Sequence, residues 1–183
     1  MKIFVKAVLT AAAFAILALP GHAPAMEPTT VAVVDVQKLL NESKAGKNIH
    51  EQLEAHKAKF LTDISQQEQK LRDDEKALTD KRATLPAEEF AEKAKTFESE
   101  LTETRRKAQE RKRAIEDAAA KSMGTLRNEI LKVVQKISDE EGYGLVINRQ
   151  NVVISSKDMD ITDKALANLD QAISQISLEI ADK

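Results

Sequence analysis

The spacing of apolar residues changes along this chain, and the changes divide it into parts. Residues 31–36 and 145–147 are short runs dominated by β-branched side chains, which is typical of buried strands. A third such run, residues 152–154, follows the second after four polar residues, so these two runs predict a β-hairpin. Between residues 43 and 141 the apolar residues instead recur every three or four positions, which indicates helix.

The long helical region is predicted to be a hairpin that spans residues 44–141. Its single proline, Pro86, should end one helix and sit in the first turn of the next, so Leu85 and Pro86 are expected at the tip, within residues 84–86. At 1.5 Å per residue the two arms would be roughly 60 and 80 Å long. A compact body of this size has a radius of gyration of only about 15 Å, so the hairpin must project from it.

Heptad spacing predicts that the two arms pack against each other, but along a thin apolar seam. The first arm contributes Leu53, Phe60, Ile64, Leu71, Leu78 and Leu85, and the second contributes Phe90, Ala94, Phe97, Leu101, Ala108 and Ile115. Polar residues interrupt the seam at Gln67, Asp74, Lys81, Thr104 and Arg111. A two-stranded coiled coil with such a core is marginally stable, so the arms should bend and fray.

The apolar stripe becomes denser near the end of the second arm, where the hairpin is expected to join the body. Its residues there are Leu126, Ile130, Val133, Val134 and Ile137. A C-terminal helix should begin near Asp160, a favourable N-cap, with Asp163 in its first turn. Its apolar face is predicted to run through Leu166, Leu169, Ile173, Ile176 and Ile180.

These elements predict an α+β fold. A small β-body, formed by residues 26–43 and 142–183 and including the C-terminal helix, carries a long projecting antiparallel helical hairpin. The only glycines of the hairpin, Gly46 and Gly124, should face each other near its base. Each costs roughly 1 kcal/mol in a helix relative to alanine, which suggests a hinge; the alternative is that one or both simply allow close packing.

Residues 1–25 are expected to be an export signal and not part of the fold. Lys2 and Lys6 give a positively charged start that precedes an apolar run over residues 7–19. Ala23 and Ala25 then fit a small-x-small cleavage site. The run is shorter than the about 20 residues that span a bilayer, so the mature chain should be soluble. It would carry 26 basic and 30 acidic residues, a net charge of −4, and its lack of cysteine suits an oxidising compartment.

Catalytic and metal-binding patterns are absent from the sequence. The two histidines of the mature chain, His50 and His56, lie six residues apart and therefore on different helix faces. Without cysteine they do not make a zinc site, and no nucleophile elbow occurs. We therefore expect a protein that is not an enzyme and that needs no cofactor.

One basic cluster stands out on the second arm. Within residues 103–113, six basic residues stand against Glu103 and Glu110, a local net charge of +4: Arg105, Arg106, Lys107, Arg111, Lys112 and Arg113. Either it is a solvated helix face paired with Asp63 and Glu68 of the first arm, or it binds anionic lipid headgroups or acidic cargo. Nucleic acid is not expected as a partner, because the exported chain is net negative and lacks interleaved aromatic residues.

Both ends of the mature chain resemble the Skp/OmpH family of periplasmic chaperones. The run from Val31 to Lys47, VAVVDVQKLLNESKAGK, is similar to the family's opening strand and helix start. The run YGLVIN from Tyr143, followed by residues 152–154 and Asp160–Thr162, is similar to its closing strand pair and helix start. The charged helical insert between them has a suitable length.

The resemblance implies a periplasmic homotrimer shaped like a jellyfish, in a Gram-negative bacterium. Three hairpins would surround a cavity that holds unfolded outer-membrane proteins without ATP and prevents their aggregation. It also implies a basic patch for lipopolysaccharide; no residue-by-residue match exists here, so the cluster at residues 105–113 is our own candidate.

Elementary physics also favours self-association of the β-body. Three short strands and one helix give a single chain too little core, and exposed strand edges invite pairing with other copies. The residues expected to build the trimer body are Val31, Val33, Val34, Leu145, Ile147, Val152 and Ile154. A periplasmic coiled-coil scaffold is the alternative function, although a scaffold would be expected to carry a denser leucine seam.

Overall fold

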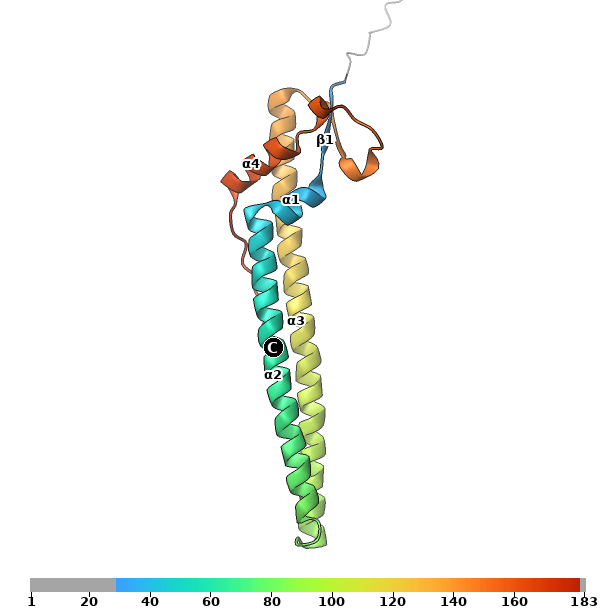
Figure 1. Cartoon of the computed structure of the whole chain (residues 1–183), viewed down its shortest axis with the longest axis vertical. Helices are drawn as coiled ribbons and strands as arrows, with labels where there is room; N and C mark the ends of the chain where they lie inside the picture. The colour runs from blue at the N-terminus through green and yellow to red at the C-terminus, as the bar shows by residue number, and fades with distance from the viewer. Residues whose placement is uncertain (1–28, 182–183) are drawn as a thin grey trace, which may run out of the picture.

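The computed structural model describes residues 29–181, and it consists of a small body with a helical hairpin extending from it (Figure 1). The predicted α+β architecture is confirmed, and the predicted export signal lies outside the described residues. The elements are β1 (Val31–Val34), α1 (Val36–Glu42), α2 (Lys44–Lys81), α3 (Ala87–Glu141), β2 (Leu145–Asn148), the 3-10 helices η1 (Arg149–Asn151) and η2 (Lys157–Met159), and α4 (Thr162–Ala172).

The body contains a two-stranded parallel sheet. β1 pairs with β2 in a register that places Val31 opposite Leu145 and Val34 opposite Asn148. On its other edge β1 accepts one further hydrogen bond, from the Ile161 amide to the Val33 carbonyl oxygen at 2.9 Å. Ala32, Val33 and Val34 are buried, as expected for a short apolar strand between neighbours.

The predicted third strand at residues 152–154 is wrong for the chain on its own. The Asn148 side chain accepts a hydrogen bond from the Gln150 amide, and a 3-10 turn follows in place of a tight β-turn. The chain therefore leaves β2 without returning along it, and no described strand pairs with residues 152–154. Val153 and Ile154 are 98% and 89% exposed. β-Branched residues favour strands only where a neighbouring strand is present to pair with them.

A short helix replaces the end of the first predicted strand. The Asp35 carboxylate accepts a hydrogen bond from the Lys38 amide at 2.9 Å, so α1 begins at Val36 and β1 ends before it. Ser43 then separates α1 from α2, and its hydroxyl oxygen accepts a hydrogen bond from the Gly46 amide. Asp170 of α4 accepts another from the Lys44 amide at 2.8 Å. Both bonds satisfy backbone donors that the first turn of a helix leaves free.

The hairpin has the predicted tip and the predicted seam. α2 ends at Lys81, three residues earlier than expected, because the Thr84 and Leu85 amides both donate to the Lys81 carbonyl oxygen. Pro86 stands at the N-cap position, one residue before α3 begins, and Glu88 and Glu89 occupy the first turn. The apolar seam residues of both arms are partly buried, except Ile115, which is buried. In the predicted denser stripe, Val133 is partly buried and the other residues are buried: Leu126, Ile130, Val134 and Ile137.

Full burial is confined to the base of the hairpin. No residue between 50 and 114 is buried, whereas Ile49, Leu126, Ile130 and Ile137 are fully enclosed. These residues form one hydrophobic cluster with side chains of β1, α1 and α4. The arms are therefore held together by a half-buried seam and are anchored by the core at one end.

The C-terminal helix is shorter than predicted. α4 ends at Ala172, and the following residues are not helical. We call residues 173–181 the C-terminal strap. Within it Ile176 and Leu178 are buried and Ile180 is partly buried, while Ser177 and Glu179 are exposed. This two-residue alternation is that of an extended chain with one face packed on a surface. The strap runs from α4 along the hairpin (Figure 1).

The two hairpin glycines have different surroundings. A Cβ atom at Gly46 would lie 2.0 Å from the carbonyl oxygen of Leu40, because α1 meets α2 at this corner. A Cβ atom at Gly124 would meet nothing within 4 Å. Close packing therefore accounts for Gly46, which was the alternative to a hinge. The hinge itself stays a prediction.

Alanine substitutions at the two glycines should have opposite effects. Gly46→Ala should lower the urea midpoint of unfolding, because the new methyl group would collide with backbone. Gly124→Ala should raise stability by about 1 kcal/mol, because alanine favours helix and the site is open. Equal shifts of the same sign, measured at one protein concentration, would contradict this account.

Candidate functional site

The body exposes apolar side chains at one end of the molecule. Among the described residues the large apolar side chains that are exposed on the body and the adjoining part of α3 are Leu131, Leu145, Val153, Ile154 and Met159. Such side chains are unfavourable in water and are commonly covered by a partner when they lie together. Residues 153–155, between the 3-10 helices η1 and η2, belong to no described strand, so their backbone could pair with another chain.

The residues predicted to build a trimer body fall into two groups. Val33 and Val34 are buried within the chain itself, and Val31, Ile147 and Val152 are partly buried. Leu145 and Ile154 are exposed, at 49% and 89%. Only the second group is fully available to another protomer, so the sequence pattern combined core residues with surface residues.

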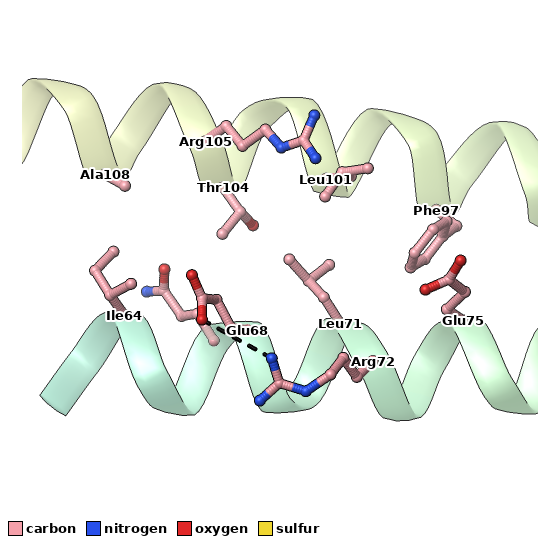
Figure 2. A pocket seen from close by; sticks show the side chains of 11 residues that line it. Ile64, Glu68, Leu71, Arg72, Glu75, Phe97, Leu101, Thr104, Arg105 and Ala108 are labelled. Carbon is pink, nitrogen blue, oxygen red and sulfur yellow. Dashed lines mark ion pairs between the residues drawn. The ribbon is translucent and has the colours of Figure 1, made fainter. Parts of the chain in front are cut away.

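A groove of about 370 Å³ opens along the seam in the middle of the hairpin. Apolar side chains of both arms line it, among them Ile64 and Leu71 of α2 and Phe97 and Leu101 of α3. Figure 2 shows Leu71 and Leu101 pointing toward each other, with Thr104 between this layer and Ile64. Thr104 is a small polar residue at a seam position, so it leaves the space that a leucine would fill.

Charged side chains border this groove. Glu68, Arg72 and Glu75 lie on the α2 side and Arg105 on the α3 side, and Arg72 pairs with Glu68 at 3.8 Å (Figure 2). Two further, more polar depressions lie nearby, one around Gln67 and Glu103 and one toward the tip around Leu78 and Lys93. The middle of the hairpin thus offers shallow surfaces in which apolar and charged groups alternate.

The basic cluster is partly neutralised within its own helix. Arg106 pairs with Glu103 at 2.6 Å and also with Glu110, and Lys112 pairs with Glu116 at 3.9 Å. The hydrogen bond from Arg106 lowers the pKa of Glu103 to about 2, so this carboxylate stays ionised in all but strongly acidic solution. The expected partner Glu68 bonds instead to Arg72 of its own helix. Arg105 and Arg113 remain exposed, so part of the local positive charge faces solvent.

The sequence reasoning missed the residues that hold the strap. The Gln52 side chain donates to the Ile176 carbonyl oxygen at 2.9 Å and accepts from the Leu178 amide at 3.0 Å. The Ser122 hydroxyl donates to the Ser177 carbonyl oxygen at 3.1 Å. The alternation of Ile176, Leu178 and Ile180 was visible in the sequence, but Ile173 and Ile176 also fitted the helical spacing that the preceding residues had set.

No helix within residues 29–181 is both long and apolar enough to cross a membrane. Over the same residues, no group of histidine and acidic side chains is arranged to hold a metal ion.

Known proteins with the same organisation give the chain its family. The model of the outer membrane protein (OmpH-like) family matches residues 30–169. Among solved structures, the fold is similar to that of an OmpH-like protein of Caulobacter crescentus CB15, assigned as an outer membrane chaperone, with a TM-score of 0.77 at 22% identity, over 85% of this chain and 91% of that one. No curated protein matches the sequence significantly. Because the family model spans most of its length, this chain belongs to the OmpH-like outer membrane protein family.

Proposed function

We propose that the protein is an ATP-independent holdase chaperone of the periplasm. It would bind unfolded outer-membrane β-barrel proteins between its helical arms and prevent their aggregation on the way to the outer membrane. One observation carries the proposal: along the arms, from residue 50 to residue 114, apolar side chains are half-buried or exposed and none is enclosed. A surface of this kind gives many weak apolar contacts to an unfolded chain and no single specific one.

The thin seam suits clients of different sizes. With polar residues at Gln67 and Thr104, the arms bury too little to be rigid, so they can bend as a client fills the space between them. Binding through many weak contacts is avid as a sum, and each contact can be released separately. Release then needs no nucleotide hydrolysis, only an acceptor that binds the client better.

We further propose that three copies assemble through the body. The support is the exposed apolar set of Leu145, Val153 and Ile154, together with residues 153–155, which belong to no described strand. In a closed ring each protomer would cover the exposed residues of its neighbour, and the same assembly would place three hairpins around one cavity. The predicted export signal at residues 1–25 would bring the chain to the periplasm.

A holdase should keep a urea-unfolded β-barrel protein soluble after dilution. We expect suppression of light scattering at stoichiometric ratios of assembled chaperone to client, without ATP. A periplasmic scaffold, the alternative function, would leave scattering unchanged and would capture a specific folded partner. Scattering of the client alone is the reference.

Assembly through the body should depend on its exposed apolar residues. The double substitution Val153→Asp and Ile154→Asp would place charges in the interface and should convert trimers to monomers in sedimentation experiments at micromolar concentration. Leu61→Asp is the matched control, because Leu61 is 66% exposed but lies on the arm. If the unmodified chain sediments as a monomer, or if the double variant remains a trimer, the proposed assembly is wrong.

The basic cluster should contribute to binding of anionic surfaces, either membrane headgroups or lipopolysaccharide. Replacing the exposed Arg105 and Arg113 by glutamine should weaken binding to anionic vesicles by about 1 kcal/mol per residue and reduce its salt dependence. The double substitution Lys93→Gln and Lys95→Gln, nearer the tip of the same helix, provides a charge-matched control. Equal binding by the two variants would assign the cluster to a solvated helix face.

A further inference from the structure

Three hydrogen bonds hold the backbone of the C-terminal strap to the hairpin base. Gln52 uses both ends of its amide group, donating to the Ile176 carbonyl oxygen and accepting from the Leu178 amide. Ser122, on the other arm, donates to the Ser177 carbonyl oxygen between them. On the strap, all three hydrogen bonds involve main-chain atoms and none involves a side chain. They therefore place no demand on sequence other than an extended conformation.

The remaining contacts select for alternation. Ile176 and Leu178 enter the hydrophobic cluster that contains Ile49 and Leu126, while Leu53, Ala119 and Met123 pack against it. The intervening Ser177 and Glu179 face outward, and Glu179 forms an exposed ion pair with Lys121 at 3.6 Å. A chain that fits here is extended and carries apolar residues at every second position.

Strands of membrane-spanning β-barrels have this pattern, because one face of each strand meets lipid and the other faces the interior. We propose that the surface beneath the strap, between Gln52 of α2 and Ser122 of α3, is a binding site for such a strand of a client protein. The strap occupies this site in the free protein and is displaced when a client strand takes its place. This inference rests on the proposed chaperone function and adds a defined strand site at the hairpin base.

The strap is well suited to be a displaceable occupant. It follows α4 directly, its residues 173–181 are not helical, and its ion pair with Lys121 is exposed on both sides. A tethered segment competes with outside ligands at an effective concentration in the millimolar range for a short linker. A single peptide must therefore approach a millimolar concentration to displace the strap, and an unfolded client displaces it more readily because it offers many such segments at once.

The test uses a cross-link that holds the strap in place. The chain contains no cysteine, so Lys121→Cys combined with Glu179→Cys introduces the only two thiols. The probe is a fluorescent peptide with the sequence of residues 173–181, and the control is a peptide of the same composition in which the alternation is broken. We expect the first peptide to bind the unlinked protein and to lose at least tenfold in affinity once a short thiol-reactive cross-linker joins the two positions.

A second pair of variants tests the recognition of backbone. A chain shortened to end at Ala172 should bind the peptide more tightly than the full chain does. In that shortened chain, Gln52→Ala should lower the peptide affinity roughly tenfold, as expected for two lost hydrogen bonds. Gln66→Ala, an exposed glutamine of the same helix, should leave it unchanged. If the shortened chain does not fold, the linked and unlinked full chains decide the question.

Equal peptide affinity with and without the cross-link, or equal affinity for the two peptides, would overturn the strand site. The proposed holdase function is read separately, as suppression of client aggregation by the unmodified protein. If the unmodified protein suppresses aggregation but the cross-link leaves peptide affinity unchanged, the chaperone function stands and the strand site is wrong. If the cross-link lowers peptide affinity but the unmodified protein does not suppress aggregation, the strand site stands and the holdase function is wrong.

Discussion

The structure depends on one constraint: apolar burial is concentrated at a single end of a very long hairpin. Ile49, Leu126 and Ile130 are enclosed with side chains of β1, α1 and α4, whereas no residue from 50 to 114 is buried. Helices of this length gain most of their stability from packing and little from propensity. The base therefore fixes where the arms start, and the arms beyond it are free to respond to whatever lies between them. The proposed holdase function relies on this division.

The strap adds a second connection at the same place. Gln52 and Ser122 come from opposite arms and both bond to the strap backbone, so the strap joins α2 to α3 just where the enclosed core gives way to the half-buried seam. Displacement of the strap from this surface would therefore affect the base of both arms. In the proposed function, client binding at the base and client binding along the arms would be physically linked.

Much of the fold could be predicted from the sequence, because the relevant signals are local or periodic. Pro86 marked the tip, seven-residue spacing marked the seam, and the runs at residues 31–36 and 145–147 marked two strands, although not their pairing with each other. Other features depend on contacts that no local pattern encodes. Residues 152–154 have strand-forming side chains but find no partner within the chain, and Ile176 fits helical spacing as well as the two-residue alternation that it actually follows. Asp35 ends β1 early through one hydrogen bond to the Lys38 amide. The sequence predicted the basic cluster on the second arm from its residue types. It did not predict the gap that Thr104 leaves in the seam.

The central claim is that a rigid base carries adaptable arms, and amide hydrogen exchange in the presence and absence of an unfolded β-barrel protein tests it most directly. The account predicts strong protection at residues 126–137 in the free protein and progressively weaker protection toward the tip, with residues 60–110 gaining protection when the client is bound. Uniformly strong protection along both arms in the free protein, unchanged by the client, would contradict it.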